Sequence, residues 1–201
     1  MRRLGGVAAA VASADGGVSN AAFVIVLLGA ESTGKTTLAR DIGAALRARG
    51  ESVAVVDEAL REFCDQHQRT PRRDEQAGIA AEQSRRIAAA AAAAGGSVVV
   101  ADTSASMIAV YSDFVFADRS LYDSAETAQR RYALTLVTAL DLPWRADGLQ
   151  RDGAHVRAPV DALVRASLQR AGVAFRTVGG SGSDRLANAL AAVDTRRAEG
   201  R

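Results

Sequence analysis

The chain has 201 residues, of which 48% are apolar and 4% aromatic, and its net charge is +2. That length is enough for one α/β domain with a full core, which must be built from Ala, Val, Leu and Ile instead of aromatic rings. Because the arginines are scattered and no stretch approaches the roughly 18 consecutive apolar residues of a membrane helix, neither a nucleic-acid-binding surface nor a membrane partner is expected.

Residues 1–21 are rich in Gly, Ala and Ser, and they are expected to form a flexible tail before a single domain over residues 22–198. The basic start and the Ala12-Ser13-Ala14 segment have the outline of a signal peptide. The segment between them is mostly Gly and Ala, which is weak for such a signal, so a tail is preferred. Cys64 is the only cysteine, which excludes an intrachain disulfide and agrees with a cytoplasmic location.

The first strand and helix of the domain flank a glycine-rich loop. Residues 23–29 are apolar throughout, as in a buried parallel strand, and residues 35–49 have helical apolar spacing. The spacing between them is G-x-x-x-x-G-K-T, which is typical of the phosphate-binding loop. The loop residues are Gly29, Ala30, Glu31, Ser32, Thr33, Gly34, Lys35 and Thr36.

The loop predicts an ATP site. In such loops, successive backbone N–H groups and the N-terminus of the following helix bind the phosphates. We expect the whole loop and Thr37 to contact ATP, with Lys35 reaching the β- and γ-phosphates. The Thr36 hydroxyl is expected to bind Mg²⁺.

Four further strands are expected to alternate with helices after this loop. Such an alternation predicts a five-stranded parallel sheet covered by helices on both faces, the α/β fold of a P-loop NTPase. Ligands of such sheets bind at the carboxyl ends of the strands. The expected strands are 52–56, 97–101, 132–139 and 174–178, and the expected helices are 59–67, 74–94, 105–117, 120–130, 160–171 and 184–198.

Three charged residues follow the second expected strand closely. A carboxylate opposite the γ-phosphate can position an acceptor hydroxyl and take its proton, so Asp57 and Glu58 are candidates for the general base. Arg61, one helical turn further on, is a candidate to bind the acceptor or neutralise charge. The alternative for all three is a surface ion pair at i,i+3 or i,i+4 spacing.

Asp102 follows the third expected strand, an apolar-strand-then-acid pattern that is typical of the Walker B element. Its expected role is to hold Mg²⁺, directly or through water. The alternative is a cap for the helix that follows.

Residues 145–158 have little periodicity, so a lid is expected at about 143–158. Arg151 is a candidate to stabilise transition-state charge when such a lid closes; the alternative is a solvated loop. Trp144 either stacks on an aromatic acceptor or packs within the protein, and Asp147 is a further candidate acceptor contact. Arg185, which follows the glycines after the fifth strand, is a candidate nucleotide contact.

Five segments in this order together resemble a known family. They are residues 29–37, the Glu58…Arg61-Glu62-Phe63 segment, Ile79–Gln83, Ala101–Thr103 and Asp141–Gly148. Over about residues 22–195 the chain is similar to the ribosylnicotinamide kinase domain of NadR-type proteins and its stand-alone relatives. Many such relatives carry only the broad label of ATP-binding or AAA-type proteins.

The resemblance implies a kinase-like P-loop fold with a lid, which transfers the γ-phosphate of ATP to the 5′-hydroxyl of nicotinamide riboside and yields nicotinamide mononucleotide. It matches Glu58 to the family's acid after the second strand, Asp102 to its magnesium-linked acid and the segment after Trp144 to its lid. Around the second and fourth strands the chain lacks the family's usual aromatic residues. Two alternatives stay open: an ATP-binding regulatory switch without an acceptor, and another nucleoside or nucleotide kinase.

Overall fold

The computed structural model describes residues 21–93, 95, 97–146 and 153–200. The expected tail therefore lies outside the described residues, apart from Ala21. The strands are β1 (Phe23–Leu28), β2 (Val53–Val56), β3 (Val98–Asp102), β4 (Leu134–Thr138) and β5 (Phe175–Val178). The helices are α1 (Lys35–Ala48), α2 (Ala59–His67), α3 (Gln76–Ala93), α4 (Ala105–Phe116), α5 (Tyr122–Gln129), α6 (Arg157–Arg170) and α7 (Gly182–Glu199), with 3₁₀ turns η1 (Arg73–Glu75) and η2 (Ala154–Val156).

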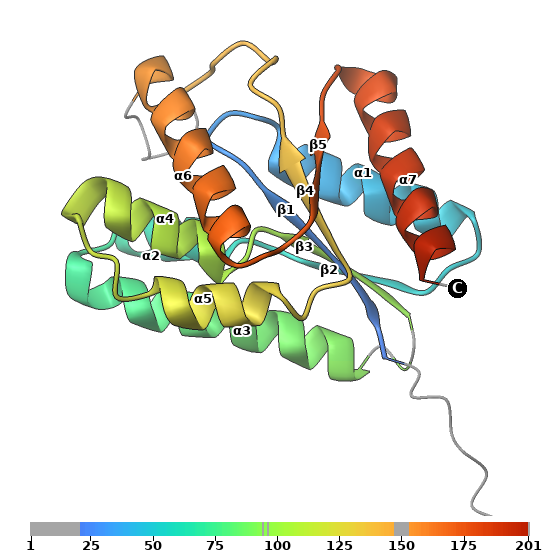
Figure 1. Cartoon of the computed structure of the whole chain (residues 1–201), viewed down its shortest axis with the longest axis horizontal. Helices are drawn as coiled ribbons and strands as arrows, with labels where there is room; N and C mark the ends of the chain where they lie inside the picture. Colours follow the sequence, from blue (N-terminus) through green and yellow to red (C-terminus); the bar gives the residue numbers. More distant parts are fainter. Residues whose placement is uncertain (1–20, 94, 96, 147–152, 201) are drawn as a thin grey trace, which may run out of the picture.

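The described strands form one five-stranded sheet in the order β2-β3-β1-β4-β5, and every neighbouring pair is parallel (Figure 1). The expected parallel α/β sheet is thus confirmed. The strand order places β1 in the centre, between β3 and β4. Consequently the loop after β1 has the ends of β3 and β4 on its two sides.

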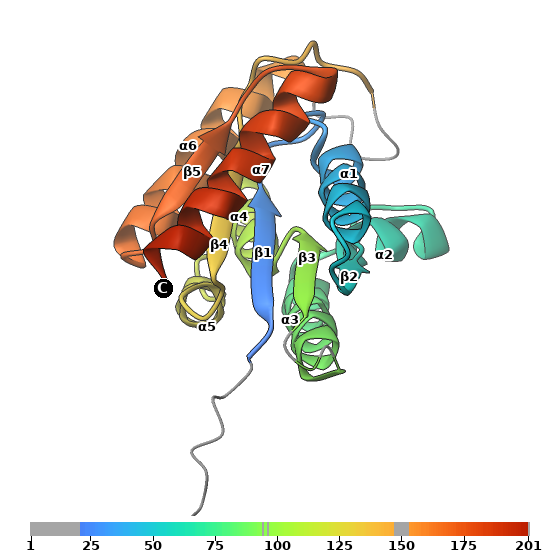
Figure 2. The same ribbon diagram turned by 90° about the vertical axis from the view of Figure 1, so that its right-hand side faces the viewer.

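Helices cover both faces of the sheet, as Figures 1 and 2 show. Side chains alternate along β1: Ile25 and Leu27 pack with α1 and α7, while Val24, Val26 and Leu28 pack with α3, α4 and α6. A strand buried on both faces needs a continuous apolar run, and this explains the sequence of β1. Among the described residues, none of the helices combines the length and the apolar character that crossing a bilayer requires.

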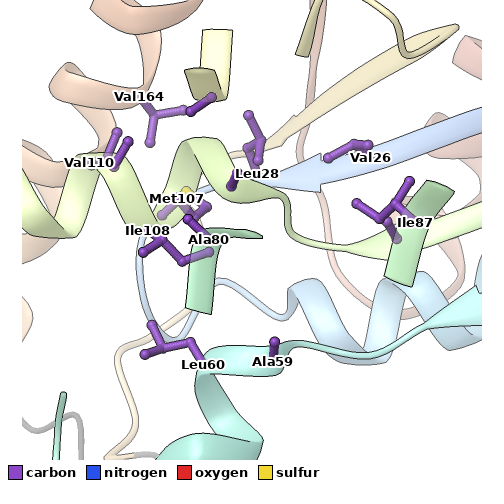
Figure 3. Packing of buried hydrophobic residues seen from close by; sticks show 14 of the residues in the cluster. Val26, Leu28, Ala59, Leu60, Ala80, Ile87, Met107, Ile108, Val110 and Val164 are labelled. Atoms are coloured by element: carbon purple, nitrogen blue, oxygen red, sulfur yellow. The ribbon is translucent and has the colours of Figure 1, made fainter. Parts of the chain in front are cut away.

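Aliphatic side chains fill the larger of the two core layers. Leu28 of β1, Leu60 of α2, Met107 and Ile108 of α4 and Val164 of α6 are at most 2% exposed and belong to this layer (Figure 3). Burying a side chain of this size contributes about 1.5–3 kcal/mol. The low aromatic content therefore does not prevent a continuous core.

Some element boundaries differ from those expected. Helix α6 begins at Arg157, three residues early, because Pro159 lies in its first turn, where no backbone N–H is needed. Strand β4 begins at Leu134 because the Tyr132 N–H bonds the Gln129 carbonyl and continues the turn after α5. The expected lid at 143–158 accordingly overlaps the start of α6.

Candidate active site at the carboxyl ends of the strands

The phosphate-binding loop leaves β1 and packs closely against β4. Gly29 has a φ of +147°, and a Cβ at this position would collide with the Thr138 hydroxyl. The Thr33 hydroxyl donates to the Ala30 carbonyl at 2.8 Å and shares a 2.7 Å hydrogen bond with the Thr138 hydroxyl. The first bond lies within the loop, and the second fixes the loop from outside its own motif, through Thr138 of β4.

The start of α1 is built to bind an anion. Gly34, its N-cap residue, has a left-handed φ of +76°, and the first turn contains no acidic residue that would compensate the positive helix end. The Lys35 ammonium donates to the Ala30 carbonyl at 2.9 Å, so it lies across the loop. Thr36 is half-buried and Thr37 is exposed.

Asp102 ends β3 and pairs in register with Leu27 of β1, so it lies next to the start of the loop. It is 2% exposed, and neither carboxylate oxygen has a hydrogen-bond partner among the described residues. A buried carboxylate without partners is costly, and a hydrated Mg²⁺ would satisfy it. The donor set therefore fits the expected metal. The alternative capping role belongs to Ser104, whose hydroxyl accepts from the Ser106 N–H.

The two acids after β2 lie in different surroundings. Glu58 is the N-cap residue of α2, its side chain is 11% exposed, and its Oε2 lies 3.7 Å from Arg61 Nε. The Asp57 side chain is 60% exposed and lies 3.8 Å from Arg40 Nη2 of α1. The i,i+3 ion pair that was the alternative for these residues therefore forms between Glu58 and Arg61, but its carboxylate is nearly buried.

A small cleft gathers the candidate residues from four segments of the chain. It is lined by Glu31, Ser32 and Lys35 of the loop, Glu58 and Arg61 of α2, Met107 and Tyr111 of α4, and Arg145. The structure thus brings Lys35, Glu58 and Arg61 together, while Asp57 and Trp144 are not among the lining residues. The sequence analysis did not identify Met107 or Tyr111. Their i,i+4 spacing on the helix that follows Asp102 was the available signal.

Gln83 of α3 is a third residue of this kind, which the sequence analysis named only as the end of the Ile79–Gln83 segment. It is fully buried, and its Oε1 accepts from the Ala59 N–H at 2.8 Å. Its Nε2 donates to the carbonyls of Asp57 and Thr103, at 3.5 and 3.4 Å. One side chain therefore joins the loops that carry Glu58 and Asp102.

The start of the expected lid is held against the phosphate-binding loop. Trp144 Nε1 donates to Glu31 Oε1 at 3.1 Å, and the Arg145 N–H donates to Ser32 Oγ at 2.8 Å. These bonds place the indole beside the loop. Asp147 and Arg151, the other two expected residues of the lid, lie outside the described residues.

Arg185 of α7 joins three segments at the sheet edge. Nη1 donates to Asp141 and to the Gly180 carbonyl, and Nη2 donates to the carbonyls of Thr33 and Ala139. Burial raises the pKa of Asp141, but hydrogen bonds from Arg185 and the Gly180 N–H outweigh it, and the pKa lies below its ordinary value. Arg185 therefore braces the loop through Thr33. Its expected contact with nucleotide stays a prediction.

Two of the solved structures that share this fold are similar over most of the chain. A NadR protein in complex with NR superposes with a TM-score of 0.72 at 18% identity, over 87% of this chain and 50% of that chain. A thymidylate kinase from Ehrlichia chaffeensis superposes with a TM-score of 0.60 at 12% identity, over 87% of this chain and 98% of that chain. The chain thus spans half the length of the NadR chain. No curated protein matches it.

These similarities confirm the expected resemblance to NadR-type domains and the kinase-like P-loop fold. A family model described as an AAA domain matches residues 24–185, which include the phosphate-binding loop, Glu58, Asp102 and Arg185. Since this match covers most of the described fold, including all of the sheet except Phe23, the chain belongs to that family of AAA domains.

Proposed function

We propose that the protein is an ATP-dependent kinase of a small nucleoside-like acceptor, with nicotinamide riboside as the leading acceptor. The observation that carries the proposal is the cleft in which Lys35 of the phosphate-binding loop meets the nearly buried Glu58 and its ion-pair partner Arg61. A switch that only binds ATP needs the loop but not an acid opposite it. A kinase needs both, because the acceptor hydroxyl must be positioned and must lose a proton.

The donor half of the reaction uses the loop and the start of α1. Their N–H groups bind the ATP phosphates, and Lys35 exchanges the Ala30 carbonyl for the β- and γ-phosphates. Thr36 and Asp102 would hold Mg²⁺, which neutralises charge on the phosphates when it is bound. The orphaned oxygens of Asp102 support this role.

The acceptor half uses α2. The acceptor hydroxyl attacks the γ-phosphorus as Glu58 takes its proton. The bond from that phosphorus to the bridging oxygen of ADP breaks at the same time, so that ADP and a phosphate monoester are the products. Arg61 lies 3.7 Å from Glu58 and keeps its carboxylate in the cleft. Asp57 remains a second candidate base, although its exposed position next to Arg40 does not favour it.

The lid completes the proposed site. Residues 143–158 are proposed to close over the phosphates, with Arg151 supplying positive charge and Trp144 and Asp147 contacting the acceptor. The hydrogen bonds from Trp144 and Arg145 to the loop support a hinge at this point. A cytoplasmic location, where ATP is available, is part of the same proposal.

Nicotinamide riboside leads among the acceptors because the NadR structure holds NR and because the sequence resemblance includes residues on both sides of the cleft. Because the fold is also similar to that of a thymidylate kinase, other nucleosides and nucleotides remain candidate acceptors. The test is an ADP-release assay with ATP, Mg²⁺ and a panel of nucleosides and nucleoside monophosphates. Slow hydrolysis that does not respond to any of them would instead support the regulatory switch.

A further inference from the structure

A long groove lies between α3 and α5, on the face of the sheet that α4 also covers. Figure 2 shows the first residues of β1 between these two helices. The volume of the groove is about 870 Å³, within the range of about 300–1,000 Å³ that is typical of small-molecule sites. It shares no lining residue with the cleft that contains Lys35. The groove is therefore a separate candidate site.

Small apolar residues form the walls of this groove. One face of α3, from Ala77 to Ala91, makes one wall over a length of about 21 Å. The opposite wall runs along α5, and the floor includes the buried side chains of Val24 and Ile87. Alanine is the commonest lining residue, and its single methyl group leaves the space between the helices open. The walls therefore fit an elongated apolar molecule.

The charge of the lining is one-sided. Among the described residues that line the groove there is no acid, but there are two arginines, Arg85 and Arg131. Glu82 neutralises Arg85 through hydrogen bonds of 2.7 and 2.8 Å. Arg131 is exposed, and its side chain forms no ion pair or hydrogen bond within the described part of the chain. Its guanidinium can therefore pair with an anion in the groove.

Arg131 lies at one end of the groove. Helices α3 and α5 each precede a strand of the same parallel sheet, so they run in the same direction. Arg131 and Tyr132 follow the end of α5, near the amino ends of the strands. Tyr132 also lines a neighbouring hollow, whose charged residues are Arg130, Arg176, Arg196 and Glu199. This end of the groove is therefore positively charged, whereas the rest is mainly apolar.

We propose that the groove binds a long-chain carboxylate of the fatty-acid type. The alkyl chain lies between α3 and α5, and the carboxylate accepts hydrogen bonds from Arg131. The apolar walls exclude a strongly polar ligand, and the unpaired guanidinium at one end selects an anionic head over a neutral or cationic one. The inference does not depend on the proposed kinase function, because the cleft and the groove have no residue in common.

Calorimetry tests the groove with three probes that differ only in the head group. Decanoate, decanol and decyltrimethylammonium are titrated into the full chain, at concentrations below those at which they aggregate. We expect one decanoate per chain, bound at least about fivefold more tightly than the other two, because only the carboxylate pairs with Arg131. Octanoate should bind more weakly, by about fourfold for each buried methylene that it lacks. No saturable binding, or equal affinity for the three probes, would overturn the proposal.

A pair of charge variants tests the position of the carboxylate. Arg131→Gln should lower the affinity for decanoate to that for decanol and leave the affinity for decanol unchanged. Arg130→Gln removes the same charge from the neighbouring residue, which does not line the groove, and should keep the preference for decanoate. A preference that survives in Arg131→Gln would contradict the assignment.

A pair of size variants tests the position of the alkyl chain. Ala88 and Ala89 are both exposed on α3, but only Ala88 lines the groove. Ala88→Trp should weaken decanoate and decanol at least about tenfold, because the indole displaces two or more methylenes from the groove. Ala89→Trp should weaken neither. Unchanged binding in Ala88→Trp would overturn the proposal.

The same size variants, without ligand, distinguish two other occupants. These are the chain's own residues 1–20, which lead to Ala21 in the lining, and a second copy of the chain. Either one would be displaced by the indole, so Ala88→Trp would then have a lower Tm or a lower mass in sedimentation than Ala89→Trp. We expect the two variants to agree in both measurements. A difference would show that the groove is already occupied and would refute the proposed ligand.

Discussion

Replacing Glu58 by glutamine tests the central assignment most directly. Glu58→Gln keeps the size of the side chain and removes the oxygen that would take the proton of the acceptor. A positioned general base contributes about 10²–10⁴-fold to rate, which corresponds to roughly 2.7–5.5 kcal/mol of transition-state stabilisation. We therefore expect kcat to fall by that factor.

The structure separates this effect from a loss of stability. Among the interactions that Glu58→Gln weakens is an ion pair, at 3.7 Å, with an Arg61 side chain that is 43% exposed. Such a pair contributes at most about 1 kcal/mol to folding. The variant should therefore melt close to the wild type and bind ATP with unchanged affinity.

Asp57→Asn is the matched control, because it makes the same chemical change one residue away and outside the cleft. Its partner, Arg40, is exposed like Asp57 itself, so the change should leave kcat within about twofold. Both variants are assayed by ADP release at saturating ATP and varied acceptor. A normal kcat in Glu58→Gln, or an equal loss in Asp57→Asn, would refute the assignment of the base.

Three further predictions concern the loop and the turn η1 before α3. Lys35→Ala should lower kcat for ADP release at least about 10²–10³-fold, because it removes the cation at the transferring phosphate; an unchanged rate would exclude that role. Gly29→Ala should lower both Tm and ATP affinity, since its Cβ would collide with the Thr138 hydroxyl; calorimetry checks both. A hydrogen bond from Arg69 lowers the pKa of Glu75 from 4.5 to about 2, so this carboxylate stabilises the fold above pH 4.5 and loses that effect as the pH falls towards 2. In Glu75→Gln, the Tm from melting curves at a series of pH values should fall less between pH 4.5 and 2 than in the wild type. An unchanged fall in Tm would contradict this prediction.

Local patterns in the sequence were sufficient to predict the fold class. The apolar run of residues 23–28 marks a strand buried on both faces, and the glycine loop marks its carboxyl end. The start of α6 differs by three residues from the expected one, because the aperiodic residues 145–158 were expected to form a loop that ends next to Pro159. In the structure it occupies the first helical turn, where proline is favoured. Sequence spacing alone does not distinguish these two positions.

Which acid enters the cleft could not be predicted, because Asp57 and Glu58 are neighbours of the same chemical type. The choice depends on Gln83, which lies 24 residues after Ala59 and bonds the Ala59 N–H and the Asp57 carbonyl. These bonds fix the turn in which Glu58 becomes the N-cap residue of α2. The direction of a side chain was thus decided by a tertiary contact from another helix.

Met107 and Tyr111 were missed for a related reason. Each lies in a helix, where a methionine or tyrosine is most often part of an ordinary packing face. They line the cleft only because the fold brings α4 next to the phosphate-binding loop and the start of α2. Their i,i+4 spacing on one helix is a weak signal until the neighbouring segments are known.

The charged residues at the carboxyl ends of the strands form two sets, which the sequence alone did not distinguish. Lys35, Glu58 and Asp102 lie where nucleotide and acceptor are expected. Asp141 and Arg185 instead neutralise each other and hold the loop through the Thr33 carbonyl. Because Thr33 also bonds Thr138 of β4, the loop is fixed from both β4 and α7. Preorganisation of this kind lets the loop bind phosphate without first losing conformational freedom, so residues outside the motif contribute to its affinity.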